Sequence, residues 1–485
     1  MQLSPDWNAA VLTSLRSITK LDLRDSRWPL TITLITFILE RCHLSLVDLT
    51  IDNLMVTDVR SVVRLLRNLQ DDPAEVALDF PKLRSLSILH PEAALRYLYA
   101  EVDFPSHAPH FKHFEQLTRL TLPVEEPRDI IESIMLADFP NLLELNLTLS
   151  YDATRRQSKI TFFNDLVTSY RHPKLRVLNI GGSPFMDDYR YPFPYSARNE
   201  RAKISLSLVL YLMRLCPELI EFRCTYMDIV NNNMFQHPLP IDHIIPRFLN
   251  FAALNPRLRL LDMRYSRSCA EIEIPPTCKM SILKMVGKIP HFCVTDYEDG
   301  VATEPLSQSD RKFQLEIFDI SGYQEAHSQS IINALSRLNR RSLKILDISL
   351  CPDVDFDSRT SDTVEECETL LSNILFMFPK LETLSIGYNN RLHDGNLRSV
   401  GRLRHKYLRS LDISGSPNIT ENGIKALLDL ESCINLQRLV LFNCPQLCLD
   451  NLRSLRSDVQ ILGEDSDHIV YELDGKQPVI SNLVS

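Results

Sequence analysis

A short phrase recurs along almost the whole chain, with leucine or another apolar residue at its first, fourth and sixth positions. It is clearest near the C-terminus, where LKILDI begins at Leu343, LETLSI at Leu381, LRSLDI at Leu408 and LQRLVL at Leu436. In an extended strand alternate side chains face opposite sides, so the apolar positions point into a core and the intervening ones point outward. A single unit cannot bury its own apolar side, and neighbouring units must therefore stack into a solenoid.

The phrase and the segments before it predict the architecture of one unit. Allowing Ile, Phe, Met, Val or Cys for Leu, the phrase begins 14 times, at intervals of 24 to 44 residues. Apolar stretches with helical spacing, such as LLSNILFMF at 370–378, precede a proline that cannot continue a helix. We therefore expect an α/β solenoid shaped as a curved horseshoe of about 14 irregular repeats, with parallel strands on the concave face and helices on the convex face. The predicted starts are Ile18, Leu46, Leu83, Leu117, Leu142, Leu175, Leu219, Leu258, Ile282, Leu315, Leu343, Leu381, Leu408 and Leu436.

Composition narrows the class of protein. The net charge of −9 argues against a general nucleic-acid binder, which would carry a basic stripe. The sequence has no apolar run long enough to cross a membrane and no secretory signal at its start. The 11 cysteines are scattered, without a CxxC pair, which is typical of reduced thiols in the cytoplasm or nucleus.

The pattern sets the domain boundaries. We expect a short N-terminal cap at 1–17, the solenoid at 18–462 and a C-terminal cap or tail at 463–485, with a candidate last strand at 459–462. Long connections at 181–203, 225–246 and 294–310 interrupt the repeat. The connection at 181–203 is a candidate rim loop over a bound partner, because aromatic side chains are common interface anchors; the alternative is a loop that packs on the solenoid itself. Its candidate contact residues are Tyr189, Tyr191, Phe193 and Tyr195.

Acidic residues recur at the fifth position of the phrase, which faces outward. Strands stack about 4.8 Å apart, so Asp319 and Asp347 are expected to be neighbours, and Arg259 and Arg264 flank Asp262. One interpretation is a concave face that binds a basic peptide; the other is that each aspartate makes local hydrogen bonds within its own repeat. The acidic fifth positions are Asp22, Asp262, Asp319, Asp347 and Asp412.

The sequence offers no catalytic, cofactor or metal motif. Glycine-rich phosphate loops, HExxH and GxSxG are absent. His107, His110 and His113 share a loop with Pro109, and their spacing does not bring three ligands onto one helix face. Cys444 and Cys448 lie at a repeat turn, where a cysteine is expected to satisfy backbone groups. We therefore expect no enzyme, no cofactor and no metal.

The C-terminal units resemble a known repeat family. LRSLDISGSPNITENGIKALL at 408–428 and the CPEL strand start at Cys216 resemble the cysteine-containing subtype of leucine-rich repeats. That subtype is typical of F-box and Zyg/zer-type substrate receptors of cullin–RING ubiquitin ligases. The resemblance implies a solenoid that binds a substrate and a separate helical motif that docks an elongin- or Skp-type adaptor.

The sequence departs from both groups of receptors. The 17 residues before the first strand leave no room for an F-box, and FILERCHLSL, which begins at Phe37, lacks the first two positions of a VHL-box motif. The favoured hypothesis is a substrate-recognition subunit of a cullin–RING ligase, or a relative of one, binding a protein on its concave face and rim loops. The alternative is a regulatory or inhibitory solenoid that wraps a protein partner and has no ubiquitin role.

Overall fold

The fold is taken from a computed structural model, in which the chain divides into two compact units that we describe separately. The first comprises 1–186 and 200–245, and the second comprises 187–199 and 246–485. The structure describes residues 13–23, 32–51, 80–88, 116–124, 140–149, 174–182, 202–205, 209, 213–225, 227–230, 248–249, 255–264, 266–268, 271–274, 279–285, 291–292, 297–298, 301–302, 313–322, 328–351, 354–356, 369–403, 405–429 and 433–463.

The first unit is built on parallel strands, each paired with the next repeat along the chain. Helix α2 (Ile32–Cys42) connects the first two strands and buries Ile35, Leu39 and Cys42. The fourth position of each phrase lies in register across the sheet, so that leucines and one phenylalanine stack as a continuous core row. The strands are β1 (Lys20–Asp22), β2 (Asp48–Ile51), β3 (Ser85–Ile88), β4 (Arg119–Val124), β5 (Glu144–Leu149), β6 (Val177–Gly182) and β8 (Glu221–Thr225).

The second unit continues the same design and adds a helix layer. Its fourth-position side chains are all buried and in register, from Leu261 on the first of its strands to Ile461 on the last. The strands are β11 (Leu260–Met263), β14 (Ile282–Met285), β18 (Ile317–Asp319), β19 (Ile345–Asp347), β20 (Thr383–Ser385), β21 (Ser410–Asp412), β22 (Arg438–Val440) and β23 (Gln460–Leu462). The helices are α8 (Ser328–Ser336), α9 (Leu370–Met377), α10 (Asp394–Leu403), α11 (Glu421–Leu428) and α12 (Leu449–Arg453).

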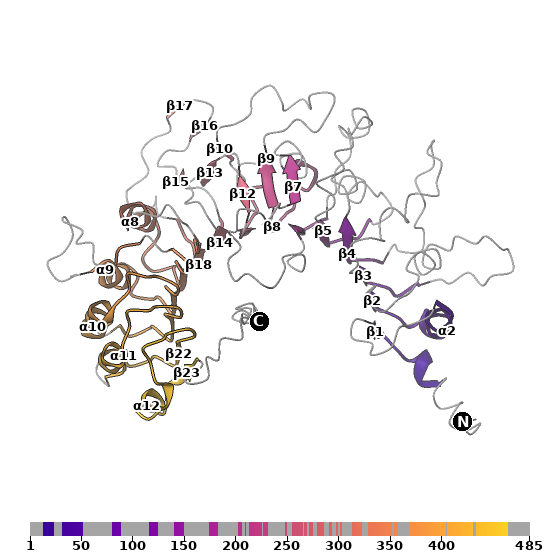
Figure 1. The fold of residues 1–485 in the computed structure, drawn as a ribbon. Helices are drawn as coiled ribbons and strands as arrows, with labels where there is room; N and C mark the ends of the chain where they lie inside the picture. Colours follow the sequence, from indigo (N-terminus) through magenta and orange to yellow (C-terminus); the bar gives the residue numbers. More distant parts are fainter. Residues whose placement is uncertain are drawn as a thin grey trace, which may run out of the picture. The chain divides into compact units, whose positions relative to one another are not determined.

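These five helices form a row on one face of the strands of the second unit (Figure 1). We call the opposite face, which carries the third and fifth positions of each phrase, the open face. Each helix presents apolar side chains to the core, such as Ile374 on α9 and Ile424 on α11, and both are fully buried. The helices in the described parts of the chain are all too short or too polar to cross a bilayer.

The predicted α/β solenoid is confirmed. Within the described residues the first unit contains seven of the parallel repeat strands and the second contains eight, and the last strand, β23, is the candidate strand at 459–462. One predicted start was wrong. Ile282 pairs with Leu260, which is a third position, so this phrase begins at Met280, and Met280, Leu283 and Met285 are the buried residues. The adjacent apolar pair Ile282 and Leu283 fits either phase, which is why the pattern alone was ambiguous.

In the middle of the chain the described parts of the connections contain short strands, because sequences such as EIEI at 271–274 alternate with period two rather than with helical spacing. Ile272 and Ile274 of that segment are buried. These strands are β7 (Ala202–Ser205) and β9 (Met227–Val230) in the first unit, and β10 (Phe248–Leu249), β12 (Arg267–Ser268), β13 (Glu271–Ile274) and β15 (His291–Phe292) in the second.

The predicted insertions are therefore not structureless where the structure describes them. In the first unit β7 and β9 pair in parallel, and they include residues of the insertions at 181–203 and 225–246. In the second unit β13 pairs with β10 and β15. The acidic insertion at 294–310 contains an antiparallel pair, β16 (Tyr297–Glu298) and β17 (Val301–Ala302).

The turn after each strand explains the recurrent Gly, Asn and Cys residues of the C-terminal repeats. At the eighth position of five successive phrases the backbone is left-handed, with φ of 71° at Gly322, 58° at Leu350 and Tyr388, 65° at Gly415 and 56° at Asn443. This conformation is unstrained for glycine and unfavourable for a residue such as leucine.

The residue after the left-handed position points into the turn. Asn389 donates to the carbonyl of Cys351 at 2.8 Å, and Cys444 donates to that of Ile413 at 3.6 Å. The expectation that Cys444 satisfies backbone groups is confirmed, and burial raises the pKa of its thiol to about 11. The seven cysteines in the described residues are all free thiols.

Candidate protein-recognition face

The fifth positions of the second unit form one continuous row across the open face. The register pairs Asp319 directly with Asp347, as predicted. Lys284 lies between Asp262 and Asp319, so the row is not uniformly acidic. Lys284 was missed because the phase assigned from Ile282 put a different residue at the fifth position. The row runs Asp262, Lys284, Asp319, Asp347, Ser385, Asp412 and Val440.

Three of these aspartates make the same local hydrogen bonds. The backbone N–H and the hydroxyl of Ser321 donate to Asp319 at 3.0 and 2.7 Å. Ser349 donates in the same way to Asp347, and Ser414 to Asp412. The interpretation of these residues as local hydrogen-bonding groups is thus supported. The signal in the sequence is an Asp-Ile-Ser triplet that occurs at 319–321, 347–349 and 412–414.

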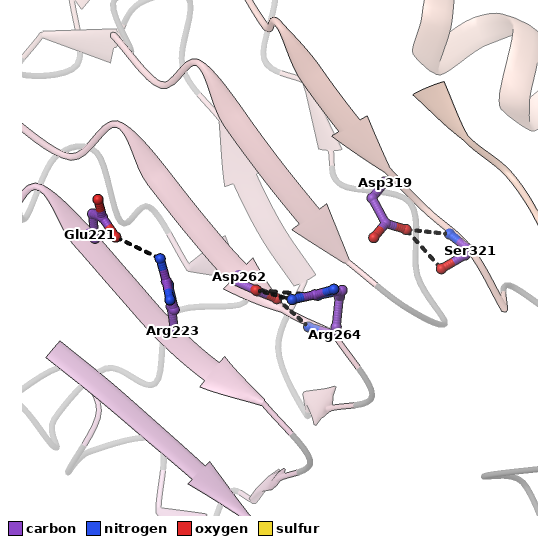
Figure 2. A network of polar contacts seen from close by, with 6 residues as sticks. All are labelled: Glu221, Arg223, Asp262, Arg264, Asp319 and Ser321. Carbon is purple, nitrogen blue, oxygen red and sulfur yellow. Dashed lines mark hydrogen bonds and ion pairs between the residues drawn. The ribbon is translucent and has the colours of Figure 1, made fainter. Parts of the chain in front are cut away.

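Asp262 has a different partner. This residue is 3% exposed, and its carboxylate is held by the guanidinium of Arg264, with Nε at 3.0 Å from one oxygen and Nη2 at 2.8 Å from the other (Figure 2). Such a two-bond pair fixes both side chains. Arg259, the other predicted flanking residue, is exposed in the segment just before β11 and lies outside this pair.

Burial and mutual repulsion perturb the carboxylates. Burial raises the pKa of Asp319, and the charges of Arg264 and Lys284 oppose that rise. Burial also raises the pKa of Asp347, and the neighbouring negative charge of Asp319 adds to the effect. Burial likewise raises the pKa of Asp412, against the hydrogen bonds from Ser414. Unpaired negative charge therefore destabilises this stretch of the open face at neutral pH.

Replacing Asp347 by Asn should stabilise the second unit at pH 8. The amide oxygen can still accept from Ser349, while the charge beside Asp319 is removed. The raised pKa of Asp347 means that its contribution to stability is complete below the ordinary value of 3.8 and is lost as the pH rises through the folded-state pKa. We expect the free energy of unfolding of Asp347→Asn to exceed that of the wild type by on the order of 1 kcal/mol at pH 8, with the difference vanishing towards pH 4.

Chemical denaturation followed by circular dichroism at several pH values measures this difference. Ser349→Ala serves as the matched control, because it removes a hydroxyl donor to the same carboxylate and should lower stability at pH 8. A stability difference between Asp347→Asn and the wild type that does not change with pH would contradict the electrostatic explanation.

The third positions of the same strands form an apolar stripe that sequence reasoning missed. Leu260, Ile282, Ile317 and Ile345 lie in register on four successive strands and are partly exposed. The following strands place Thr383 at this position, then Ser410 and Arg438. We call the first four residues the apolar stripe. It borders the row of Asp262, Lys284, Asp319 and Asp347, so this part of the open face combines aliphatic contact area with charge.

The open face of the first unit is polar and carries charge of both signs. Its third positions include Lys20, Asp48, Arg119, Glu144 and Glu221. At the fifth positions, Asp22 and Arg223 are charged, and the guanidinium of Arg223 donates to Glu221 at 2.8 Å (Figure 2). Val177 is the one apolar third position on the described strands of this unit, so the apolar stripe distinguishes the second unit.

Several predicted features lie outside the described residues. They include the rim-loop residues Tyr189, Tyr191, Phe193 and Tyr195 and the three histidines at 107–113. Among the described side chains no group of three His, Cys, Asp or Glu residues is placed to hold a metal ion.

Comparison with known proteins adds little to this description. No protein-family model matches the chain, and no curated protein matches its sequence. Among solved structures it has a likeness to the crystal structure of the Rad7 and Elc1 complex in yeast, with 12% sequence identity and a TM-score of 0.37, covering 73% of this chain and 76% of that chain. A similarity of this size assigns no function, and the solenoid fold is evident from the strand register and the buried core.

Proposed function

We propose that the protein is a non-catalytic recognition scaffold of the leucine-rich-repeat class, in its cysteine-containing subtype, and that the open face of the second unit binds a protein partner. The observation that carries the proposal is the apolar stripe. Four partly exposed aliphatic side chains on adjacent strands form a continuous apolar area. Burying such an area on binding drives association. The charged row beside the stripe supplies orientation and specificity.

The partner fits this surface best as an extended or helical segment with aliphatic and basic side chains. Asp319 and Asp347 are direct neighbours, with no cation between them in the row. In each of them the serine two residues later donates both of its hydrogen bonds to Oδ1, so that Oδ2 receives none from that serine. A lysine or arginine of the partner would relieve the repulsion between the two carboxylates.

We further propose that the scaffold acts as a substrate-recognition subunit of a cullin–RING ubiquitin ligase, or as a relative of such a subunit, in the cytoplasm or nucleus. This step is supported by the resemblance of the C-terminal repeats to the receptor subtype. The adaptor would be of the elongin or Skp type. The alternative, a regulatory solenoid without a ubiquitin role, makes the same use of the open face and differs only in lacking the adaptor.

Affinity purification of the tagged protein from cells, with a proteasome inhibitor present and mass spectrometry as the readout, separates these proposals. Recovery of a cullin together with an elongin- or Skp-type adaptor supports the ligase receptor. Recovery of a protein partner without any cullin rejects the ligase step and leaves the recognition scaffold in place.

A further inference from the structure

A second charged surface lies away from the open face, along the edge at which strands of the second unit begin. The connections 337–344, 378–382 and 405–409 lead from α8, α9 and α10 into β19, β20 and β21. Those three strands are parallel and paired in sequence order, so the three connections lie side by side. We call this surface the leading edge.

The leading edge is basic, although the whole chain carries a net charge of −9. Its five exposed cations have no ion pair with any acid in the described parts of the chain. Two acids beside these connections are already engaged: Glu316 bonds Lys344 at 2.7 Å, and Glu382 lies 3.8 Å from Arg409. The exposed cations are Arg337, Arg340, Arg341, Lys380 and Lys406.

Large apolar side chains are exposed among these cations. Phe376 at the end of α9 is 41% exposed, Tyr407 beside Lys406 is 51% exposed, and Ile434 in the connection before β22 is 55% exposed. The register of β21 and β22 places Ile434 at the turn position equivalent to Lys406 in the neighbouring repeat. Arginine and aromatic residues together are the composition that protein interfaces favour.

Hydrogen bonds between repeats fix the backbone under this surface. The ring of His405 bridges its own turn to the neighbouring repeat, with Nε2 at 3.1 Å from the carbonyl oxygen of Phe378 and Nδ1 accepting from the N–H of Leu408 at 3.1 Å. Asn435 donates to the carbonyl of Lys406 at 2.6 Å. A surface whose backbone is already ordered loses little conformational entropy when a partner binds.

We propose that the leading edge is a second docking surface and that its ligand is an acidic protein segment with interspersed apolar side chains. Carboxylates of the segment would pair with Arg340, Arg341 and Lys406, because guanidinium and ammonium groups bind carboxylates through charge-assisted hydrogen bonds. Its apolar side chains would cover Phe376 and Tyr407. The acidic remainder of the chain repels a long nucleic acid, whose binding requires an extended basic surface. The leading edge is separate from the apolar stripe. It requires an acidic partner, whereas the open face favours a partner with basic side chains.

Fluorescence anisotropy with the full chain tests the proposal. The probe is a labelled peptide of repeating glutamate and leucine with one tyrosine, at low ionic strength. We expect Arg340→Ser/Arg341→Ser/Lys406→Ser to weaken binding by about tenfold or more, since several charge pairs are lost. The matched control Arg391→Ser/Arg398→Ser/Lys425→Ser removes the same charge elsewhere on the second unit and should change the affinity little.

Tyr407→Ser should also weaken the binding of the glutamate–leucine peptide, and it should leave the binding of a pure glutamate peptide unchanged. Failure of the wild type to bind the peptide, or equal weakening by both triple variants, would overturn the proposal. Tighter binding of a single-stranded oligonucleotide than of the peptide, lost in the leading-edge variant, would also overturn it in favour of a nucleic-acid surface.

Discussion

Leu346→Ala is expected to lower the free energy of unfolding of the second unit by about 2–5 kcal/mol, because it leaves a cavity where a fully buried leucine was packed. Leu346 lies in register between Phe318 and Leu384, so the cavity would interrupt the core row that joins three repeats. In a solenoid each repeat is stabilised mainly by its neighbours. Denaturation followed by circular dichroism measures the loss, and hydrogen exchange should show it on β18 and β20 as well as on β19.

Ile345→Ala supplies the matched control on the same strand. Ile345 is a residue of similar size one position away, and it faces the open side in the apolar stripe. We expect it to cost no more than about 1 kcal/mol, because a partly exposed side chain loses less burial. Equal losses from the two substitutions would contradict the assignment of core and open faces.

Gly415→Ala is expected to destabilise the second unit by about 1–3 kcal/mol, because the left-handed backbone at this position disfavours any side chain. Its φ is 65°, and a β-carbon there would collide with the ring of Tyr388 from the preceding repeat. The ring cannot move away freely, since the hydroxyl of Tyr388 accepts from Asn443 at 3.1 Å. Chemical denaturation measures this effect as a lower denaturant midpoint with an unchanged dependence of the unfolding free energy on denaturant concentration.

The equivalent turn of another repeat tests the same explanation with the opposite sign. Leu350 has φ of 58° and carries a side chain for which that conformation is unfavourable. Leu350→Asn should raise the free energy of unfolding by about 0.5–1 kcal/mol, because asparagine tolerates the left-handed region. A stabilised Gly415→Ala variant, or a Leu350→Asn variant weakened as much as Gly415→Ala, would contradict the assigned turn geometry.

The recurrent apolar phrase was enough to predict the fold. Alternate side chains of a strand face opposite sides, and the leucines of one repeat can be buried only against neighbouring repeats, so the chain forms a parallel solenoid. The weak pattern at 459–462 also predicted β23. The pattern gave the wrong phase where either of two starting residues places apolar residues in the core, as at Ile282 and Leu283. It also did not predict the short strands within the connections, such as β13 at 271–274.

The candidate site was predicted in part. The neighbouring positions of Asp319 and Asp347 followed from the phrase, but Lys284 was hidden by the phase error. The apolar stripe was missed because an aliphatic residue at a third position looks like one more core residue until the register is known. The basic leading edge was missed because its cations lie in three separate connections, which only the strand pairing brings together.

Recognition through the open face is tested by comparing the wild type with Ile317→Lys/Ile345→Lys in parallel affinity purifications with quantitative mass spectrometry. Lysines at these positions interrupt the apolar stripe, and their ammonium groups can pair with Asp319 and Asp347, so the fold should be retained. We predict that at least one abundant partner of the wild type falls by about tenfold or more in the variant, because burial of the apolar stripe would drive its association and a buried lysine opposes it. Any ligase adaptor should remain. Unchanged recovery of every partner, with an unchanged circular dichroism spectrum, would contradict recognition through the open face.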